Sequence, residues 1–336
     1  MGIARSYLLR LERNRRRLRS FRKSFQLTSV VNRLKSAAPD AVLLFSTLRN
    51  EMPRLAYFLA YYRKLGVSHF CFVDNDSSDG GREYLAAQKD CSVWRASGSY
   101  RDANFGMDWL NFLLNRNAAD RWTLVVDTDE FLVYSHCQTR PLPALTHWLD
   151  TQSIRSFGAV LVDMYPRGPV EETVCQPGDD PFRKLSWFDS GNYTYRLHSR
   201  YRNLWIRGGP RQRVYFADQP DHSPALNKIP LVKWQRGYVY VSSTHAMLPR
   251  RLNRTYGETG GESPCGCLLH AKLSKGLQEK AIEELARKEH YANSREYKAD
   301  LRDLGGRAKI WNEHSTPYHD WRSLEECGLM SAGGWL

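Results

Sequence analysis

From residue 41 onward, short apolar runs alternate with amphipathic helical stretches, and this alternation limits the fold more than any other feature. A run that is apolar at nearly every position is typical of a strand buried on both faces of a sheet. The predicted strands are Ala41–Ser46, His69–Val73, Cys91–Trp94, Thr123–Val126 and Gly158–Met164. The predicted helices are one that begins at Pro53 and stops at Gly66, then Phe105–Arg116 and Leu142–Leu149. This order predicts an α/β fold with a mostly parallel, Rossmann-like sheet flanked by helices.

Three polar clusters directly follow predicted strands, namely Thr47–Glu51, Asp74–Asp79 and Asp127–Glu130. Ligands of open α/β sheets bind beyond the carboxyl ends of the strands, so we expect the three clusters to converge there. Asp79 is placed to cap the helix that follows it. Arg49 has two readings, because it can bind a phosphate or pair with Glu51 on the surface.

The third cluster, Asp127-Thr128-Asp129-Glu130, holds three carboxylates in four residues. Like charges this close repel each other unless something positive offsets them. Alternate positions of an extended chain point the same way, so Asp127 and Asp129 can face one ion. Carboxylate oxygens suit hard cations, which predicts Mn²⁺ or Mg²⁺ at these two residues. A solvated acidic turn is the simpler alternative.

The basic charge of the chain is concentrated at its start. The whole chain carries +13, and residues 1–38 hold eleven Lys and Arg against Glu12 alone, which is +10. Because the charge is confined to this segment, nucleic-acid binding by the fold is not expected. Several apolar residues of the segment fall on one helical stripe: Tyr7, Leu11, Leu18, Phe21 and Phe25. A basic helix with an apolar edge suits an anionic membrane surface, and a solvated tail is the alternative.

These features predict three parts: a basic amphipathic segment 1–38, a catalytic domain 39–275 and a helical C-terminal extension 276–336. The last includes a predicted helix over Leu277–Tyr291. Residues 166–236 give few periodic signals, although Tyr238–Ser242 is predicted as a strand. Seven cysteines in no disulfide spacing indicate a reducing compartment. With no signal peptide and no membrane-spanning run, we expect a cytoplasmic protein, peripheral on the inner membrane face if the basic helix binds there.

The order of the motifs resembles a known family. TLRNE, FVDNDSSDGG and WTLVVDTDEFLVY, followed by VDMYPRGP, GGPRQRVYF, NKIPLVKW, SSTHAML and LLHAK, are similar to glycosyltransferase family 2, over about residues 41–300. The likeness is greatest to its bacterial branch with a D-x-D-E-F signature. It implies a GT-A fold, a nucleotide-sugar donor, a divalent metal and an inverting mechanism. It also places Asp74 and Asp76 near the nucleoside, Asp127 near the ribose and metal, and Asp129 as the principal metal ligand.

The remaining site residues follow from this reading. Thr47, Arg49, Glu51 and Lys272 are predicted to contact the donor. GT-A enzymes often complete the metal shell with a late histidine, for which His270 is our first choice and His245 the second. Inversion requires a carboxylate near the acceptor hydroxyl, and the candidates are Asp163 and Asp189. Arg211, Arg213, Lys228 and Lys233 are further cations that can neutralise a diphosphate. The acceptor is a glycan or another hydroxyl-bearing molecule.

Three other functions fit parts of the pattern. A nucleotidyl- or phosphoryl-transfer enzyme can use the same carboxylates, but it needs a glycine-rich phosphate loop near the first strand, where this sequence has none. A nucleic-acid-binding protein is a second alternative, disfavoured by the position of the charge. A catalytically silent sugar-nucleotide-binding protein is a third, disfavoured by the intact pair Asp127 and Asp129.

Overall fold

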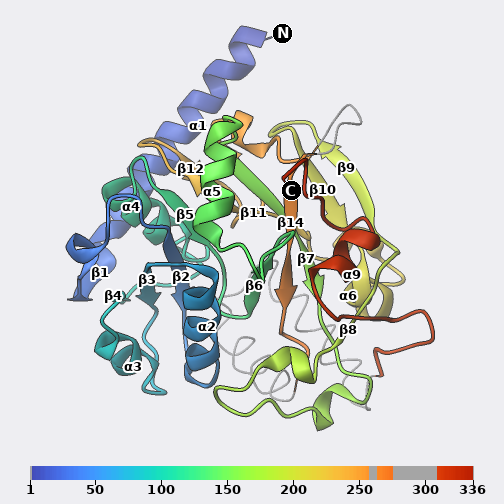
Figure 1. Ribbon diagram of the computed structural model, residues 1–336. Coiled ribbons are helices and arrows are strands. Elements are labelled where there is room, and N and C mark those ends of the chain that lie inside the picture. Colours follow the sequence, from blue (N-terminus) through green and yellow to red (C-terminus); the bar gives the residue numbers. More distant parts are fainter. Residues whose placement is uncertain (1, 257–262, 275–308, 336) are drawn as a thin grey trace.

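A nine-stranded sheet forms the centre of the molecule in the computed structural model, which describes residues 2–256, 263–274 and 309–335 (Figure 1). The strand order is β1-β4-β3-β2-β5-β11-β7-β14-β6. Six strands run in one direction: β2 (Leu43–Leu48), β3 (His69–Asp74), β4 (Cys91–Ala96), β5 (Trp122–Val125), β7 (Ser156–Asp163) and β14 (Cys265–His270). The strands β1 (Leu27–Val31), β6 (Glu130–Val133) and β11 (Asn227–Lys233) run the other way. The predicted α/β fold with a mostly parallel, Rossmann-like sheet is confirmed.

Helices cover both faces of this sheet, because successive side chains of each strand point to opposite faces. Leu44 of β2 packs in one core with α2 (Met52–Leu65), α3 (Gly81–Ala87) and α5 (Leu142–Thr151). Its neighbours Leu43 and Phe45 pack on the other face with α4 (Met107–Asn117). The predicted helices therefore exist, with boundaries shifted by one or two residues. Burial on both faces explains why the strands read as unbroken apolar runs.

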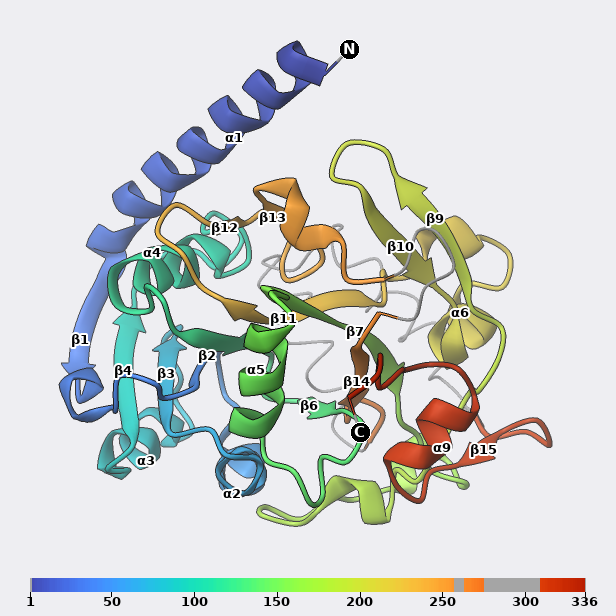
Figure 2. The same ribbon diagram turned by 45° about the horizontal axis from the view of Figure 1, so that its top comes forward.

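The predicted segment 1–38 does not stand apart from this architecture. Its helix α1 (Gly2–Lys23) packs on α4, and Arg19 forms an ion pair with Asp108 at 2.6 Å. Its strand β1 pairs with β4 and so closes one edge of the sheet. Figures 1 and 2 show the N-terminal end of α1 reaching past the body of the protein. No helix in the described ranges is long and apolar enough to cross a membrane.

Besides β11 and β14, the second half of the chain forms short elements, in a region whose sequence shows little periodicity. They are β8 (Trp187–Phe188), the hairpin of β9 (Thr194–His198) and β10 (Asn203–Arg207), α6 (Gly209–Tyr215), β12 (Val239–Tyr240), β13 (Met247–Leu248), β15 (Thr316–Pro317) and α9 (Trp321–Glu326). The predicted strand Tyr238–Ser242 is thus only two residues long. The predicted helix Leu277–Tyr291 lies outside the described residues. The boundaries of the three predicted parts stay a prediction.

Candidate functional site

The three polar clusters meet at the carboxyl edge of the parallel strands, as expected. Backbone N–H groups of Asn50 and Ser78 donate to Ser77 Oγ and Asn50 Oδ1 at 3.0 and 2.9 Å, which joins the first two clusters. Asp79 accepts from the backbone N–H of Gly81 at 3.0 Å and from that of Met52 at 2.7 Å, although the N-cap position of α3 is Gly80 rather than the predicted Asp79. One carboxylate therefore fixes the starts of both α3 and α2.

The third cluster joins the other two through Arg54, which lies in the first turn of α2. Its Nη1 atom lies 3.3 Å from Asp129 Oδ2 and 3.7 Å from Glu51 Oε2. Arg54 is a site residue that the sequence analysis missed. The available signal was a basic side chain at the start of a helix that directly follows a strand-end cluster.

A second cation, Lys228, lies beside two carboxylates of the cluster and offsets their charge. Its Nζ atom lies 2.8 Å from Glu130 Oε1 and 3.9 Å from Asp127 Oδ2. Lys228 and Glu130 are both buried. Burial alone lowers the pKa of Lys228, but Glu130 and Asp127 outweigh it and raise that pKa. Lys228 comes from β11, whose register shifts between Lys228 and Leu231, and such bulges often redirect a side chain next to a site.

Asp127 is the carboxylate of the cluster that remains open to a ligand. Its side chain is 54% exposed, and its one ion pair in the described chain is the long contact to Lys228. Partial burial and the negative charges of Glu130 and Asp129 raise its pKa, whereas Lys228 lowers it, and solvent screens part of these effects. An additional positive charge at Asp127 is therefore electrostatically favourable.

Asp163 and His270 form a buried pair behind Asp129. His270 Nδ1 lies 2.6 Å from Asp163 Oδ1, Arg211 Nε donates to Asp163 Oδ2 at 2.7 Å, and His270 Nε2 lies 3.4 Å from Asp129 Oδ2. Burial raises the pKa of Asp163, but Arg211 and His270 outweigh it, so this pKa lies below its ordinary value. Burial lowers the pKa of His270, yet Asp129 and Asp163 raise it to about 8. His270 is therefore a cation at neutral pH.

The two candidate histidines differ in charge. His245 Nδ1 lies 2.6 Å from the carbonyl oxygen of Asn227, which can only accept, so Nδ1 holds the proton. Burial and the nearby charge of Lys228 lower the pKa of His245 to about 3. Metal ligation requires a neutral imidazole. On protonation state alone, His245 suits a metal better than His270, although only His270 contacts the carboxylate cluster.

Asp189 lies in a neighbouring network rather than in the carboxylate cluster. Its Oδ1 accepts from Tyr165 Oη at 2.6 Å, and Arg213 donates to both of its oxygens at 3.0 and 3.1 Å. Arg213 and Arg211 both come from α6, so one short helix carries the cation that binds Asp189 and the cation that binds Asp163. Each oxygen of Asp163 and of Asp189 thus has a hydrogen-bond partner.

The predicted donor-binding residues line the same edge of the sheet. Asp74 is buried and accepts from the backbone N–H of Ser77 at 3.2 Å, which shapes the turn, while Asp76 pairs with Arg95. Arg49 donates to the Asn75 carbonyl at 2.7 Å, and its two predicted roles stay predictions. The hydroxyl of Thr47 is buried and lacks a hydrogen-bond partner in the described chain.

The late segment that carries Lys272 returns to this edge. Strand β14 pairs with β6, which places His270 opposite Glu130, and the backbone N–H of Ala271 donates to the Asp129 carbonyl at 2.8 Å. Lys272 follows directly and is half-buried. Lys233, by contrast, pairs with Asp150 at 2.7 Å and not with a carboxylate of the cluster.

The predicted metal ligands do not form a preassembled cage. Within the described ranges, no three His, Cys, Asp or Glu side chains come together as a set that holds an ion. Asp129 already has Arg54 and His270 beside it, and Glu130 has Lys228. Asp127 is the exposed carboxylate of the cluster, and the predicted metal site at Asp127 and Asp129 stays a prediction.

Comparisons with known proteins add little to the site. No protein-family model matches the sequence, and no curated protein matches it. Among solved structures, a putative glucose-1-phosphate thymidylyltransferase from Bacillus anthracis, in complex with a sucrose, superposes with a TM-score of 0.29. The two chains are 10% identical, over 85% of this chain and 93% of that chain. At this TM-score the likeness carries no argument about activity. The resemblance to glycosyltransferase family 2 stays a prediction from the motifs.

Proposed function

We propose that the protein is a GT-A type glycosyltransferase. It moves a sugar, which we propose is a hexose, from a nucleotide-diphosphate sugar to an acceptor hydroxyl, and the transfer proceeds with inversion. The observation that carries the proposal is the carboxylate cluster beyond β5, in which Lys228 lies 2.8 Å from Glu130 and Arg54 lies 3.3 Å from Asp129, whereas exposed Asp127 has only a long contact of 3.9 Å to Lys228. An open carboxylate beside fixed cations suits a diphosphate that arrives with a divalent metal. When bound, Mn²⁺ or Mg²⁺ supplies positive charge that offsets the charge growing on the leaving nucleoside diphosphate.

In this proposal the residues of the chain bind and orient the donor. Asp127 and Asp129 hold the metal. Lys228 and Arg54 offset the charges of Glu130 and Asp129. Thr47, Asp74 and Asp76 lie at strand ends beside the nucleotide. Fixed charges of this kind need no reorganisation during the reaction, which is how preorganised sites lower a barrier.

We infer that Asp163 and Asp189 do not act as the general base for which the sequence makes them candidates. A general base needs a carboxylate oxygen within reach of the acceptor proton. Because both oxygens of each residue already accept hydrogen bonds, we infer that they are positioning residues. Asp163 orients His270 and Arg211, and Asp189 orients Arg213.

Calorimetry with nucleoside diphosphates in Mn²⁺ tests the donor site. Asp127→Asn and Asp129→Asn are expected to weaken Mn²⁺-dependent binding by about a hundredfold, because each removes a charged ligand. Asp40→Asn, an equal charge change at an exposed position, is the matched control and is expected to bind normally. Unchanged binding in both site variants contradicts the assignment.

Product analysis separates the proposal from its rivals. A glycosyltransferase releases a nucleoside diphosphate from a nucleotide sugar, whether the acceptor is a sugar or water. A nucleotidyltransferase instead releases pyrophosphate from a nucleoside triphosphate and a sugar 1-phosphate. Release of pyrophosphate, with no nucleoside diphosphate formed from any nucleotide sugar, contradicts glycosyl transfer. Binding without either product identifies a silent sugar-nucleotide-binding protein.

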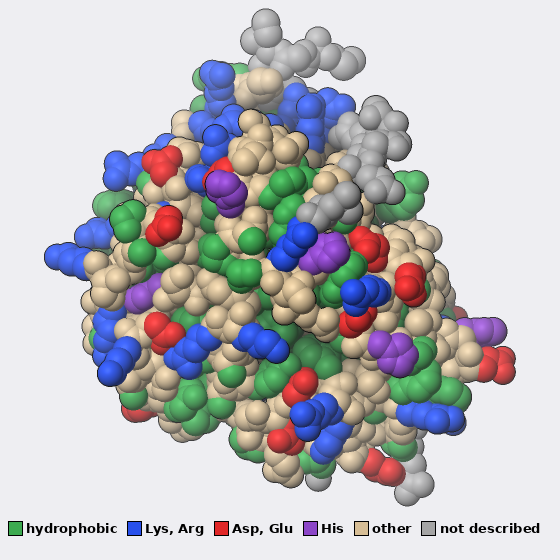
Figure 3. All heavy atoms as spheres, in the orientation of Figure 1, with side chains coloured by type: hydrophobic (Ala, Val, Ile, Leu, Met, Phe, Trp, Pro, Cys, Tyr) green, Lys and Arg blue, Asp and Glu red, His purple; other side chains and the backbone are tan. Residues whose placement is uncertain are grey.

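We further propose that α1 lies on an anionic membrane surface. The apolar stripe Tyr7, Leu11, Leu18, Phe21 and Phe25 is 37–80% exposed. At 100° per residue it lies opposite Leu9 and Ser20, which are buried against the protein, so the stripe points outward. Arginines flank the stripe, and Figure 3 shows Lys and Arg side chains gathered over the region of α1. Apolar insertion and charge attraction therefore act on the same surface.

A further inference from the structure

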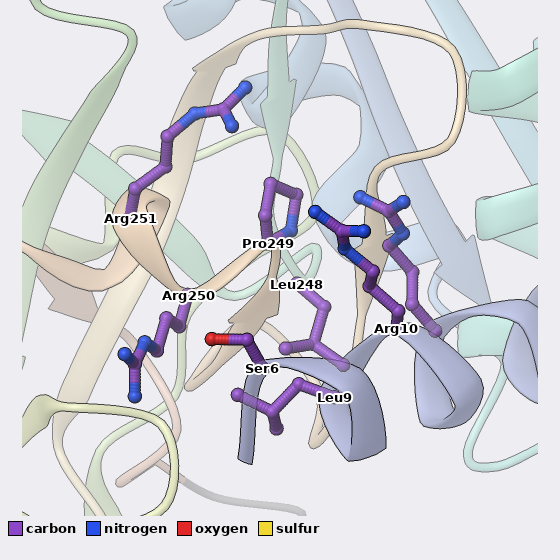
Figure 4. A pocket seen from close by; sticks show the side chains of 8 residues that line it. Ser6, Leu9, Arg10, Leu248, Pro249, Arg250 and Arg251 are labelled. Carbon is purple, nitrogen blue, oxygen red and sulfur yellow. The ribbon is translucent and has the colours of Figure 1, made fainter. Parts of the chain in front are cut away.

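A cavity of about 420 Å³ lies between α1 and the turn that follows β13 (Figure 4). This volume is within the range of about 300–1,000 Å³ that small-molecule sites occupy. Four arginines line the cavity, Arg10 and Arg13 from the helix and Arg250 and Arg251 from the turn. The floor is apolar, because Leu9 and Leu248 are buried side by side in one small core.

The arginines of this cavity lack acidic partners within the described chain. The nearest acidic residue on α1, Glu12, is already bound by Arg16, Arg200 and Tyr201 at 3.1, 2.6 and 2.8 Å. Arg251 donates to the hydroxyl of Tyr238 at 3.0 Å, which leaves its charge unmatched. Burial and the like charges of Arg17, Arg10 and Arg251 lower the pKa of Arg13. Crowded cations without a counter-charge favour an anionic ligand.

Arg13 also presents an unsatisfied donor. Its Nε atom is buried and has no hydrogen-bond partner in the described residues. A buried donor without a partner is destabilising unless a ligand or solvent completes it. A phosphate group fits this need, because guanidinium groups bind its oxygens through charge-assisted, often bidentate, hydrogen bonds.

We propose that this arginine pocket binds the phosphate headgroup of an anionic lipid. The apolar floor and the volume exceed what a free phosphate ion requires, and both suit the glycerol and first methylene groups of a lipid. The site is independent of glycosyl transfer, since none of its residues belongs to the carboxylate cluster.

Calorimetry on the full chain with a soluble short-chain phosphatidic acid tests the pocket without a membrane. One-to-one binding is expected, with inorganic phosphate at least about tenfold weaker because it lacks the apolar contacts. Short-chain phosphatidylcholine of the same tail length should not bind detectably, since its choline cation faces the arginines. If inorganic phosphate binds as tightly as phosphatidic acid, the site recognises free phosphate and the lipid assignment is wrong.

Variants that remove equal charge test whether binding depends on the pocket or on the overall positive charge of α1. Arg13→Gln/Arg250→Gln should weaken binding of phosphatidic acid by about a hundredfold, since each removes a charge-assisted hydrogen bond. Arg15→Gln/Arg22→Gln removes the same charge from exposed positions of α1 outside the pocket and should leave binding within about twofold. Equal losses in the two double variants overturn the pocket.

A second variant keeps all the arginines in case their removal disturbs folding. Ser6→Asp places a carboxylate at the exposed rim and should weaken binding of phosphatidic acid by about tenfold through repulsion. Normal binding by a folded Ser6→Asp protein contradicts the proposal. So does tighter binding of a single-stranded oligonucleotide that competes with phosphatidic acid, because it identifies the ligand as nucleic acid.

Discussion

The carboxylate cluster and the arginine pocket both gather side chains of one charge, yet only the first contains its own counter-charges. In the cluster, Lys228 faces Glu130 and Arg54 faces Asp129 at hydrogen-bonding or ion-pair distance. In the pocket, Arg10, Arg13 and Arg250 have no acidic partner in the described chain. The difference teaches that paired charges keep the carboxylate cluster in place whether or not a ligand is present. The unpaired charges of the arginine pocket favour the binding of an anion.

The largest effect is expected at the matched pair Lys228 and Glu130. Lys228→Met leaves Glu130 buried without a cation and should lower the free energy of unfolding by about 3–5 kcal/mol, measured by urea denaturation. Lys233→Met, on the same strand but paired with the more exposed Asp150, is the control and should cost about 1 kcal/mol or less.

The double variant Lys228→Met/Glu130→Gln sharpens this test, because it removes both charges of the pair. It should recover most of the stability lost in Lys228→Met, since no unpaired charge then remains buried. If Lys228→Met unfolds no more easily than Lys233→Met, the buried pair does not stabilise the cluster and the contrast with the pocket fails.

An intermediate effect is expected from the titration of His270. Its pKa in the folded state is about 8, above the ordinary value of 6.5, so the folded protein binds this proton more tightly than the unfolded chain. The stabilisation, about 2 kcal/mol, is complete below pH 6.5 and is lost as the pH rises through 8. Unfolding in metal-free buffer between these pH values measures it. His270→Gln should remove this slope, and a slope that persists in the variant must come from another group.

The smallest effect has the opposite sign and belongs to the pocket. Arg13→Gln removes one charge from a crowded set in which Arg10 and Arg17 lie three and four residues away on the helix. Relief of this repulsion should raise the free energy of unfolding by about 0.5 kcal/mol at low salt and by less at high salt. A destabilised variant would mean that the Arg13 charge already has a stabilising partner.

Elements with strong local signals were predictable from the sequence. The strands β2, β3 and β5 are apolar runs followed by polar clusters, and Asp79 marks the chain one residue before the N-cap of α3. The convergence of the three polar clusters also followed, because parallel strands present their carboxyl ends at one edge.

Elements whose identity depends on distant partners were not predictable. Strand β11 contains Pro230, which argues against a central strand, and only the register shift beside Lys228 accommodates it. The sequence predicts that Glu130 belongs to a polar turn, yet this residue begins β6 because β14 pairs with it. The ion pairs of Arg54 with Asp129 and of Lys228 with Glu130 join residues 75 and 98 positions apart in the chain, and no local pattern reports such contacts.

The place of β14 in the sheet has a consequence for how the chain is made. Residues 265–270 insert between β7 and β6, which were synthesised more than a hundred residues earlier. Until they emerge from the ribosome, β6 and β7 each present an unpaired edge, and His270 is missing beside Asp163. The site is therefore completed among the last events of folding. Truncations that stop before Cys265 should yield a chain that keeps strands β2 to β5 but aggregates through its open edges.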